Sequence, residues 1–427
     1  MGVLARLLGT ERPPAPRLQP RRLKDAYQAG QPLSSASSSV QSAFGFGVAL
    51  SHTGVPVTPS TALQSSAVYA CVRCSSEDMA KLSIDVQRAL PNGGWKSDRE
   101  HPIARLLDRP NRWQSWFTFM SYGTTCLQLR GNAYIFVVRD QDGAPTSLVP
   151  ISPDRCAIRL SPKGWLYYDI WHPAFGDRGN LVVHQDDMLH LRNMTLDGFI
   201  GMSPIAAAAE AIGLSLATQQ HGANLFRNGT QASGVLKHEG TLGDVGRKNL
   251  RESWQAAYGG VDNASKVLVL EEGMTFEKLS MTADEAQFLE TRKFQVEEIC
   301  RIFRVPPHKV MSLDRATFSN IENQNQQYID DSLVPIARQL EEEARHKLFW
   351  EAERGQVRLR IDFDSLLRGD RKTRYDAAHI ALGDGWKSRN EVRADEGLPP
   401  IPGGDEYRVA LNTGVSEAPS SATEPAQ

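Results

Sequence analysis

Two long helical patterns, separated by a pair of prolines, constrain this chain more than any other feature. The first covers residues 282–305, where Thr282 and Glu285 have the spacing of a capping box and apolar residues then recur at helical intervals. The Pro306-Pro307 pair must end this helix, because proline has no amide hydrogen and restricts the residue before it. A second helical pattern runs over residues 319–349. Two long helices joined by a short loop, without a catalytic cluster, indicate a mechanical role.

Another long helix is predicted upstream, over residues 203–229. Ser203 is a suitable N-cap, Pro204 suits the first helical position, and Asn228-Gly229 provides a C-terminal stop. A strand–helix–strand pattern over residues 231–281 separates this helix from the next one. Short strands and helices alternate in the sequence that precedes it. The chain is therefore predicted to have an α+β fold.

Several short motifs are spread along most of the chain. In sequence order they are Tyr69-Ala-Cys-Val-Arg, His101-Pro followed by Leu106-Leu107-Asp-Arg-Pro110-Asn111, Gly131-Asn-Ala-Tyr134, Met188-Leu-His190-Leu-Arg192, Gly201-Met-Ser-Pro204-Ile, Phe303-Arg-Val-Pro-Pro307 and Asn390-Glu-Val-Arg393-Ala-Asp-Glu-Gly397-Leu-Pro-Pro400. This series resembles the portal proteins of tailed bacteriophages, in the group typified by long-tailed phages and shared with gene transfer agents. Each motif alone is a weak signal, but together they stand in the family's order over roughly residues 60–410.

The resemblance implies a portal fold assembled as a ring. Its regions would be a flexible N-terminal arm (1–60), an α+β wing (61–202), a stem helix (203–230), a β-α-β clip (231–281), a second stem helix (282–305), a tunnel loop (306–320), a kinked helix and a strand that return to the wing (321–369), a helical crown (370–410) and a disordered tail (411–427). Pro335 lies where the kinked helix is expected to bend.

The charge balance indicates how such a protein meets DNA. The chain has 48 Lys and Arg against 50 Asp and Glu, a formal net charge of −2. Sequence-independent DNA binding depends on Lys and Arg, because affinity comes from releasing the counterions of the phosphates. A near-neutral chain is therefore expected to let DNA slide past rather than to hold it.

Two residue clusters have spacings that could support other chemistry. Cys71-Val-Arg-Cys74 is a CxxC within a helical pattern, and without a second pair it predicts buried thiols rather than a four-ligand zinc site. The cluster His184-x-Asp186-Asp187-x-x-His190 is a candidate metal site, against the alternative of a strand edge with His190 outward or satisfied in the core. Motifs for nucleotide binding, serine hydrolysis and zinc proteolysis are missing from the sequence. We therefore expect no enzymatic activity, no metal, no cofactor and no association with a membrane.

The loop and the helix after it carry the candidate DNA-facing residues. Lys309 and Arg315 lie in the loop itself. Amide side chains that can hydrogen-bond phosphates without a fixed charge follow in the next helix, at Asn320, Asn323 and Asn325. Two alternatives stay open: the amides form a solvated helix face, and the two cations pair with Asp314 and other acidic neighbours.

The predicted clip helix carries a second pair of candidates. Trp254 and Tyr258 are four residues apart and share one helix face. They either pack the clip or anchor a partner protein.

The resemblance implies a ring, usually of twelve copies, at one vertex of the capsid in the virion, assembled in the host cytoplasm. DNA would enter through its channel during packaging and leave through it during ejection. The implied partners are other copies of the chain, double-stranded DNA, the large subunit of terminase, a head–tail adaptor and the major capsid protein. A non-viral oligomeric scaffold or pore is the alternative, and it fits the helices but not the ordered motifs.

Overall fold

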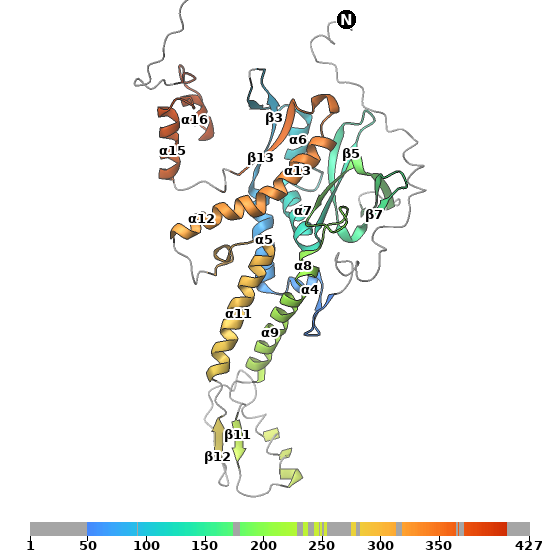
Figure 1. Ribbon diagram of the computed structural model, residues 1–427, viewed down its shortest axis with the longest axis vertical. Coiled ribbons are helices and arrows are strands. Elements are labelled where there is room, and N and C mark those ends of the chain that lie inside the picture. Colours follow the sequence, from blue (N-terminus) through green and yellow to red (C-terminus); the bar gives the residue numbers. More distant parts are fainter. Residues whose placement is uncertain are drawn as a thin grey trace, which may run out of the picture. The chain divides into compact units, whose positions relative to one another are not determined.

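The computed structural model divides into two compact units, Met1–Phe363 and Asp364–Gln427 (Figure 1). The residues that the structure describes are 49–91, 93–173, 180–228, 234–237, 243–246, 248–249, 252–253, 275–278, 282–312, 318–363, 366 and 371–407. Several predictions fall outside these residues. They concern the arm before residue 49, the tail at 411–427, and Arg315, Trp254 and Tyr258.

The fold begins before the predicted end of the arm at residue 60. Ala49–Leu50 (β1) and Pro56–Val57 (β2) form an antiparallel ladder, and Pro59–Ala62 (α4) follows. The amide of Thr61 donates to the Thr58 hydroxyl at 3.1 Å, and the amide of Thr58 donates to the Thr61 hydroxyl at 2.8 Å. This capping box starts the helix. The boundary at residue 60 is therefore corrected, because the composition of the segment concealed a local capping motif.

Three antiparallel sheets form the α+β part of the first unit. Each has three strands, and their orders are β10-β5-β6, β13-β3-β4 and β7-β8-β9. The strands are β3 (Ser83–Ala89), β4 (Trp95–Ser97), β5 (Asn132–Arg139), β6 (Pro145–Ile151), β7 (Cys156–Leu160), β8 (Leu166–Trp171), β9 (Asn180–His184), β10 (Met188–Arg192) and β13 (Val357–Asp362). Strand β13 comes from far along the chain and pairs with β3, with Ile361 opposite Ile84.

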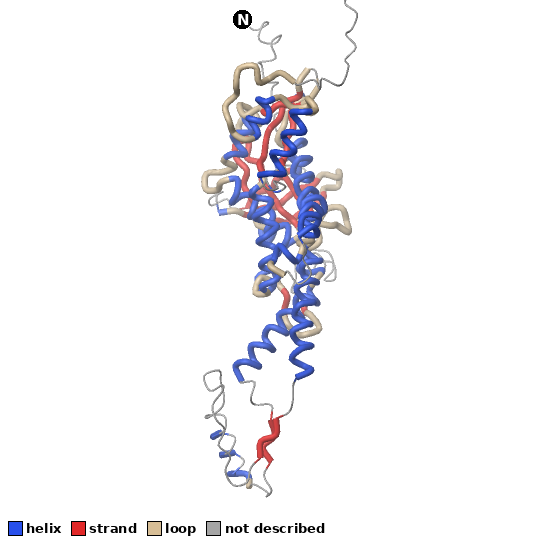
Figure 2. Tube along the Cα trace, turned by 90° about the vertical axis from the view of Figure 1, so that its left-hand side faces the viewer, coloured by secondary structure: helices blue, strands red, loops and turns tan. Residues whose placement is uncertain are grey.

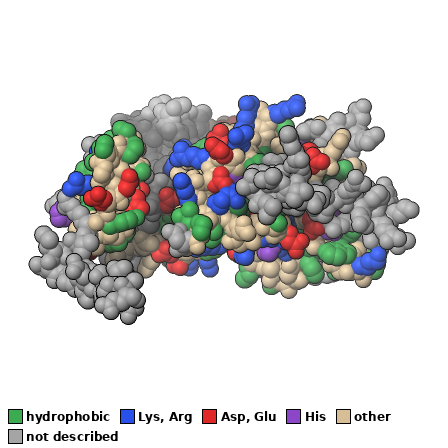
Figure 3. Space-filling model, turned by 90° about the horizontal axis from the view of Figure 1, so that it is seen from above, with side chains coloured by type: hydrophobic (Ala, Val, Ile, Leu, Met, Phe, Trp, Pro, Cys, Tyr) green, Lys and Arg blue, Asp and Glu red, His purple; other side chains and the backbone are tan. Residues whose placement is uncertain are grey.

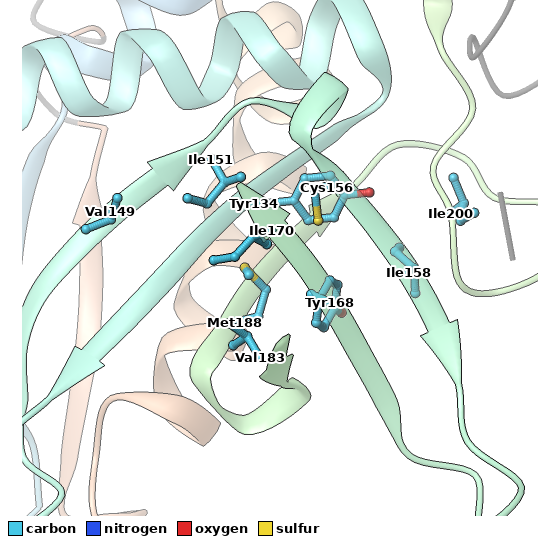
Figure 4. Packing of buried hydrophobic residues seen from close by; sticks show 10 residues of the cluster. All are labelled: Tyr134, Val149, Ile151, Cys156, Ile158, Tyr168, Ile170, Val183, Met188 and Ile200. Atoms are coloured by element: carbon cyan, nitrogen blue, oxygen red, sulfur yellow. The ribbon is translucent and has the colours of Figure 1, made fainter. Parts of the chain in front are cut away.

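A core of buried side chains joins two of these sheets (Figure 4). It takes Tyr134 from β5, Met188 from β10, and Tyr168 and Ile170 from β8. Inward residues recur every second position, as on one face of a strand. Each fully buried side chain of this size contributes about 1.5–3 kcal/mol through removal of its surface from water. The core therefore holds β7-β8-β9 against β10-β5-β6.

Four helices pack beside the sheets or extend from them. They are α5 (Ser66–Lys81), α6 (Pro102–Asp108), α7 (Trp116–Arg130) and α8 (Pro204–Ala207). The hydroxyl of Ser203 accepts the amide of Ala206 at 3.3 Å, as its predicted capping role requires. The single helix predicted from residue 203 is nevertheless interrupted. Ala208 leaves helical geometry at φ −107° and ψ 20°, and α9 (Ala209–Asn228) follows.

The long helices α9 and α11 (Thr282–Phe303) lie side by side (Figures 1 and 2). The buried Gln295 of α11 donates to the hydroxyl of Thr218 on α9 at 3.0 Å. Between them in sequence, β11 (Gly234–Lys237) and β12 (Thr275–Lys278) form an antiparallel pair. Between these two strands, the described residues 244–246, 248–249 and 252–253 are helical.

The helix after the proline loop is interrupted as well. It consists of α12 (Phe318–Tyr328), a π-turn (Ile329–Leu333) and α13 (Val334–Lys347). The π-turn ends at Leu333, two residues before Pro335, at which a bend was predicted. Proline removes one helical hydrogen bond, and π-turns are a common accommodation of such a defect. Ser319, the first residue of the predicted helical pattern, lies inside the first turn of α12.

Polar side chains of α13 cover the outer edges of two sheets. Gln339 accepts the amide of Arg192 and donates to its carbonyl, both at 2.9 Å. The amide of His190 donates to Glu343 at 3.1 Å. Two further bonds run from Lys347 Nζ to the Met188 carbonyl (2.8 Å) and from the Ile361 amide to Glu341 (2.8 Å). The exposed backbone groups of β10 and β13 thus find partners in one helix.

In its described residues, the second unit has the helices α15 (Arg371–Gly383) and α16 (Arg389–Asp395). A capping box between Ser388 and Glu391 starts α16, and Gly397 follows its end with φ 68°. Asn390 is buried and donates to the Ile401 carbonyl at 3.0 Å. The loop after α16 is therefore fixed to the helix.

Two sequence motifs meet at a tight junction between α7 and β5. Gly131 ends α7 in the left-handed region with φ 75°. A Cβ atom on Gly131 would lie 2.2 Å from the Met202 carbonyl oxygen, and one on Gly201 would lie 2.1 Å from the Gly131 carbonyl oxygen. Asn132 donates to the Gly201 carbonyl and accepts its amide, both at 2.8 Å. The close approach therefore requires glycine on both sides.

We expect Gly131→Ala to lower stability by well over ~1 kcal/mol, because alanine is strained at this φ and its methyl group clashes with backbone. Gly123→Ala is a matched control on the same helix, because a Cβ atom there meets nothing within 4 Å. It should raise stability by up to about 1 kcal/mol through helix propensity. Thermal unfolding of both variants measures the difference. Equal midpoints for the two variants would contradict the junction.

Candidate nucleic-acid interface at the proline loop

The proline loop begins at an unusual helix end. Arg304 has φ 54°, in the left-handed region where glycine is normally found. Its amide donates to the Arg301 carbonyl at 3.3 Å, and the Val305 amide donates to the Cys300 carbonyl at 2.9 Å. These two bonds form a Schellman motif. The end of α11 is thus fixed before the first proline.

Contacts with the π-turn compensate the strain at Arg304. Its guanidinium donates to the Asp331 carbonyl at 3.1 Å, and the Ser332 hydroxyl donates to the Arg304 carbonyl at 2.7 Å. The Asp331 carbonyl lies four residues before Pro335, which has no amide to bond it. The arginine therefore supplies the donor that the proline removes, and it joins the end of α11 to the kinked helix.

Lys309 lies in a short 3-10 turn, Pro307–Val310 (η7), and points at helix α5. Its Nζ is 3.4 Å from Asp78 Oδ2 and 5.2 Å from the centre of the Tyr328 ring. The side chain is 28% exposed. Lys309 therefore pairs with an acidic residue, which was the alternative to contact with DNA. That neighbour is Asp78, far from the loop in sequence, whereas Asp314 lies outside the described residues.

The predicted amide residues are divided between two environments. His308 Nδ1 is 2.9 Å from Gln324 Oε1, and His308 Nε2 is 2.9 Å from Asn325 Oδ1. Asn325 is therefore engaged within the chain, whereas Asn323 is exposed. Asn320 lies in α12, with its side chain outside the described residues. Sequence reasoning missed His308 as a partner of this helix, although its position directly after two prolines marked it as part of the turn.

A half-buried group of side chains surrounds the Lys309 pair. Burial, with the neighbouring Cys74 and Asp78, raises the pKa of the Tyr328 phenol well above its usual range. Burial also raises the pKa of the Cys74 thiol to about 11. Both groups therefore remain protonated at neutral pH. Cys74 Sγ lies 3.6 Å from Asp78 Oδ2, so the thiol faces the carboxylate.

The CxxC motif forms part of this packing. Cys71 is fully buried in α5, and its Sγ lies 3.9 Å from Cys300 Sγ of α11. Cys71 and Cys74 both carry free thiols. The prediction of buried thiols is confirmed for Cys71, whereas Cys74 is only partly buried.

The candidate metal cluster does not converge. The amide of Asp186 donates to His184 Nδ1 at 3.3 Å, while Asp187 pairs with Arg139 at 2.6 Å. His190 is buried, with Nε2 at 3.0 Å from Asn132 Oδ1 and Nδ1 at 3.2 Å from the Tyr168 hydroxyl. Over the described part of the chain, no group of three or more His, Cys, Asp or Glu side chains is arranged to hold a metal ion. His190 is instead satisfied in the core, the alternative reading.

Comparison with known proteins covers most of the chain. The sequence model of the family described as phage portal protein matches residues 66–397. The chain belongs to the phage portal protein family. A probable portal protein of Streptomyces phage phiC31 is 37% identical over 385 residues, which cover 87% of this chain and 83% of that protein. The portal protein of Enterobacteria phage HK97 is 31% identical over 369 residues, which cover 84% and 85%.

Solved structures support the same portal fold. A chain from the virion of a native gene transfer agent particle has a TM-score of 0.58 at 23% identity, with coverage of 89% of this chain and 99% of that chain. A chain from the neck of the native particle, computed with C12 symmetry, has a TM-score of 0.56 at 21% identity and the same coverage. The α+β class expected from the sequence is confirmed as the mixed helix and sheet fold of portal proteins.

Membership of the portal family gives the sequence motifs a structural meaning. Gly131 and Gly201 belong to two of them and meet at one junction. The motif at Met188–Arg192 is strand β10, whose edge α13 covers. These motifs therefore maintain the fold. In the described residues, no helix is long and apolar enough to cross a bilayer.

His190 predicts how stability depends on pH. Burial, with smaller effects of Arg192 and Lys347, lowers the His190 pKa well below 6.5. The unfolded chain therefore binds the proton more readily, and stability present above pH ~6.5 is lost as the pH falls below it, by up to ~1.4 kcal/mol per pH unit. His190→Gln keeps a donor and an acceptor without titrating. We expect its unfolding midpoint to fall less than that of the wild type between pH 7.5 and 5.

His346→Gln is the control for this measurement, because His346 is 61% exposed. It should keep the wild-type dependence on pH. If His190→Gln shows the wild-type dependence as well, buried His190 does not determine the loss of stability in acid.

Proposed function

We propose that this chain assembles as a ring at one vertex of the capsid and that DNA passes through the channel of the ring. The observation that carries the proposal is the match to phage portal proteins in sequence and in fold over most of the chain. A ring of twelve copies is proposed because one structural relative comes from a neck computed with C12 symmetry. The location in the virion follows from the same relatives. Assembly in the host cytoplasm is part of the proposal.

The charge distribution supports passage rather than storage of DNA. Among the side chains coloured in Figure 3, acidic and basic residues are interspersed. The net charge of the chain is −2. A wall with many phosphate contacts would bind DNA tightly and in a strongly salt-dependent way. A mixed surface allows brief contacts that DNA can leave.

We assign the brief DNA contacts to the proline loop and to the start of α12. Asn323 is exposed there, and Arg315 and Asn320 are close to it in sequence. Lys309 and Asn325 already have partners within the chain, so they reach DNA only where those bonds open.

The β-α-β segment over residues 231–281 is proposed to dock the large subunit of terminase and the head–tail adaptor. Trp254 and Tyr258 are the proposed anchors on its helix. The major capsid protein is the third viral partner. The register of β11 and β12 sets Gly234 opposite Lys278, so the two ends of the segment are adjacent. The described strands therefore bring the two ends of this segment together between α9 and α11.

A structural role without hydrolysis is part of the proposal. Among the described residues, the polar side chains of the proline loop and of the segment 184–190 have structural partners and are not aligned around a reacting centre. ATPase and nuclease assays of the purified chain should give no turnover. The alternative of a non-viral oligomeric scaffold or pore is not favoured, because the two relatives compared above are phage portal proteins.

Asn323→Lys tests the DNA-facing assignment. It adds one cation per copy at an exposed site, and each new phosphate contact steepens the dependence of DNA binding on salt. Packaging should slow or stop early, giving shorter packaged DNA and fewer filled particles. Asn180→Lys is the matched control, because Asn180 is also exposed but lies in β9. Identical packaging by the two variants would sink the assignment.

Removal of residues 233–279 with a short linker tests the docking assignment. The adjacent ends of β11 and β12 should allow α9 and α11 to stay paired, so the sheets fold normally. Binding to the purified adaptor should be lost, and Trp254→Ala with Tyr258→Ala should weaken it. Adaptor binding that survives the deletion would show that docking occurs elsewhere.

A further inference from the structure

We propose that Lys309 and His308 are positioning residues, which hold the turn over residues 307–312 against α5 and α12. Lys309 reaches α5 through Asp78, and His308 reaches α12 through Gln324 and Asn325. The importance of this turn for DNA rests on the proposed function. The position of the turn follows from its own contacts and is independent of that function.

The contact with α5 is built around a buried carboxylate. The Asp78 side chain is 7% exposed and faces two lysines, Lys81 at 3.0 Å and Lys309 at 3.4 Å. Lys81 belongs to α5 itself, whereas Lys309 links the carboxylate to the loop. A buried charge that loses a partner is destabilised far more than one at the surface. The Tyr328 ring beside Lys309 Nζ adds a cation–π contact from α12.

The contact with α12 uses both nitrogen atoms of one imidazole. His308 Nδ1 and Nε2 each lie 2.9 Å from an amide oxygen, of Gln324 and Asn325 respectively. Gln324 and Asn325 therefore contact the ring at both of its nitrogen atoms. A side chain held at two points has less freedom to rotate than one held by a single bond.

Backbone bonds close the turn between these contacts. The Met311 amide donates to the His308 carbonyl at 3.2 Å, and the Ser312 amide donates to the Pro307 carbonyl at 3.0 Å. Met311 has φ 64° and is 85% exposed. A bulky residue persists in this conformation only where its surroundings fix it. The side chains on either side of the turn provide that fixation.

Asp78→Asn separates positioning from direct contact with DNA. This change removes the carboxylate and leaves the charge of Lys309 in place. If Lys309 contacted DNA directly, Lys309→Met alone would reduce the packaging of DNA. If Lys309 positions the turn, Asp78→Asn and Lys309→Met remove the same interaction and their effects do not add.

Hydrogen exchange of the full-length assembled chain measures the position of the turn. Peptides that cover residues 305–312 should exchange at least about fivefold faster in Lys309→Met and in Asp78→Asn, with no further increase in the double variant. His308→Ala should act in the same direction, and Lys309→Arg should stay near the wild type. Lys81→Met is the matched control, because it removes the other partner of Asp78 without touching the loop. Its exchange at 305–312 should be unchanged.

Unchanged exchange in both Lys309→Met and Asp78→Asn would overturn the proposal. So would faster exchange in Lys309→Met alone, because the carboxylate would then play no part. Packaging assays on the same variants test the link to DNA: we expect equal losses in packaged DNA for Lys309→Met and Asp78→Asn. Faster exchange with normal packaging would overturn the role of this turn in DNA passage while leaving the portal assignment intact.

Discussion

The fold depends on the way that one helix completes the edges of two sheets. Strands β10 and β13 each end a three-stranded sheet and would otherwise leave backbone groups without partners. Side chains of α13 supply these partners at every second residue of β10, the spacing at which an antiparallel strand directs its groups outward. Glu341 does the same for β13. An apolar helix face alone would hold the sheets without fixing their position along the helix.

This arrangement places the proline loop in mechanical contact with the sheets. Helix α13 continues from the π-turn, and the π-turn is bonded to Arg304 at the end of α11. The Arg304 guanidinium bonds the Asp331 carbonyl, which Pro335 leaves without an amide partner, and the Ser332 hydroxyl bonds the carbonyl of the strained Arg304. These two bonds connect α11 to the kinked helix. In a portal protein, a force applied to α11 or to the loop is therefore transmitted to the sheets through these hydrogen bonds. The sequence motifs of the family fall at such junctions, as at Gly131 and Gly201.

Local signals allowed much of this fold to be predicted, and distant contacts explain what was missed. Chemistry within a few residues determines the end of α11 at the two prolines and the Ser203 cap. Both features can therefore be predicted from the sequence alone. The break at Ala208 has no sequence signal, because an alanine run is compatible with a continuous helix. For the candidate site, the sequence predicted which segment carries it but not the contacts of its side chains. Lys309 turns towards Asp78 through a contact between residues 231 positions apart, which spacing does not reveal.

An axial view of the purified full-length chain by electron microscopy tests the central claim most directly. The portal assignment predicts a closed ring with a central hole, with twelve copies as the proposed number. Mass measurement on the same sample should then give several hundred kilodaltons, since one chain has a mass of 47.2 kDa. A monodisperse monomer, unchanged by salt at micromolar concentration, would contradict the account.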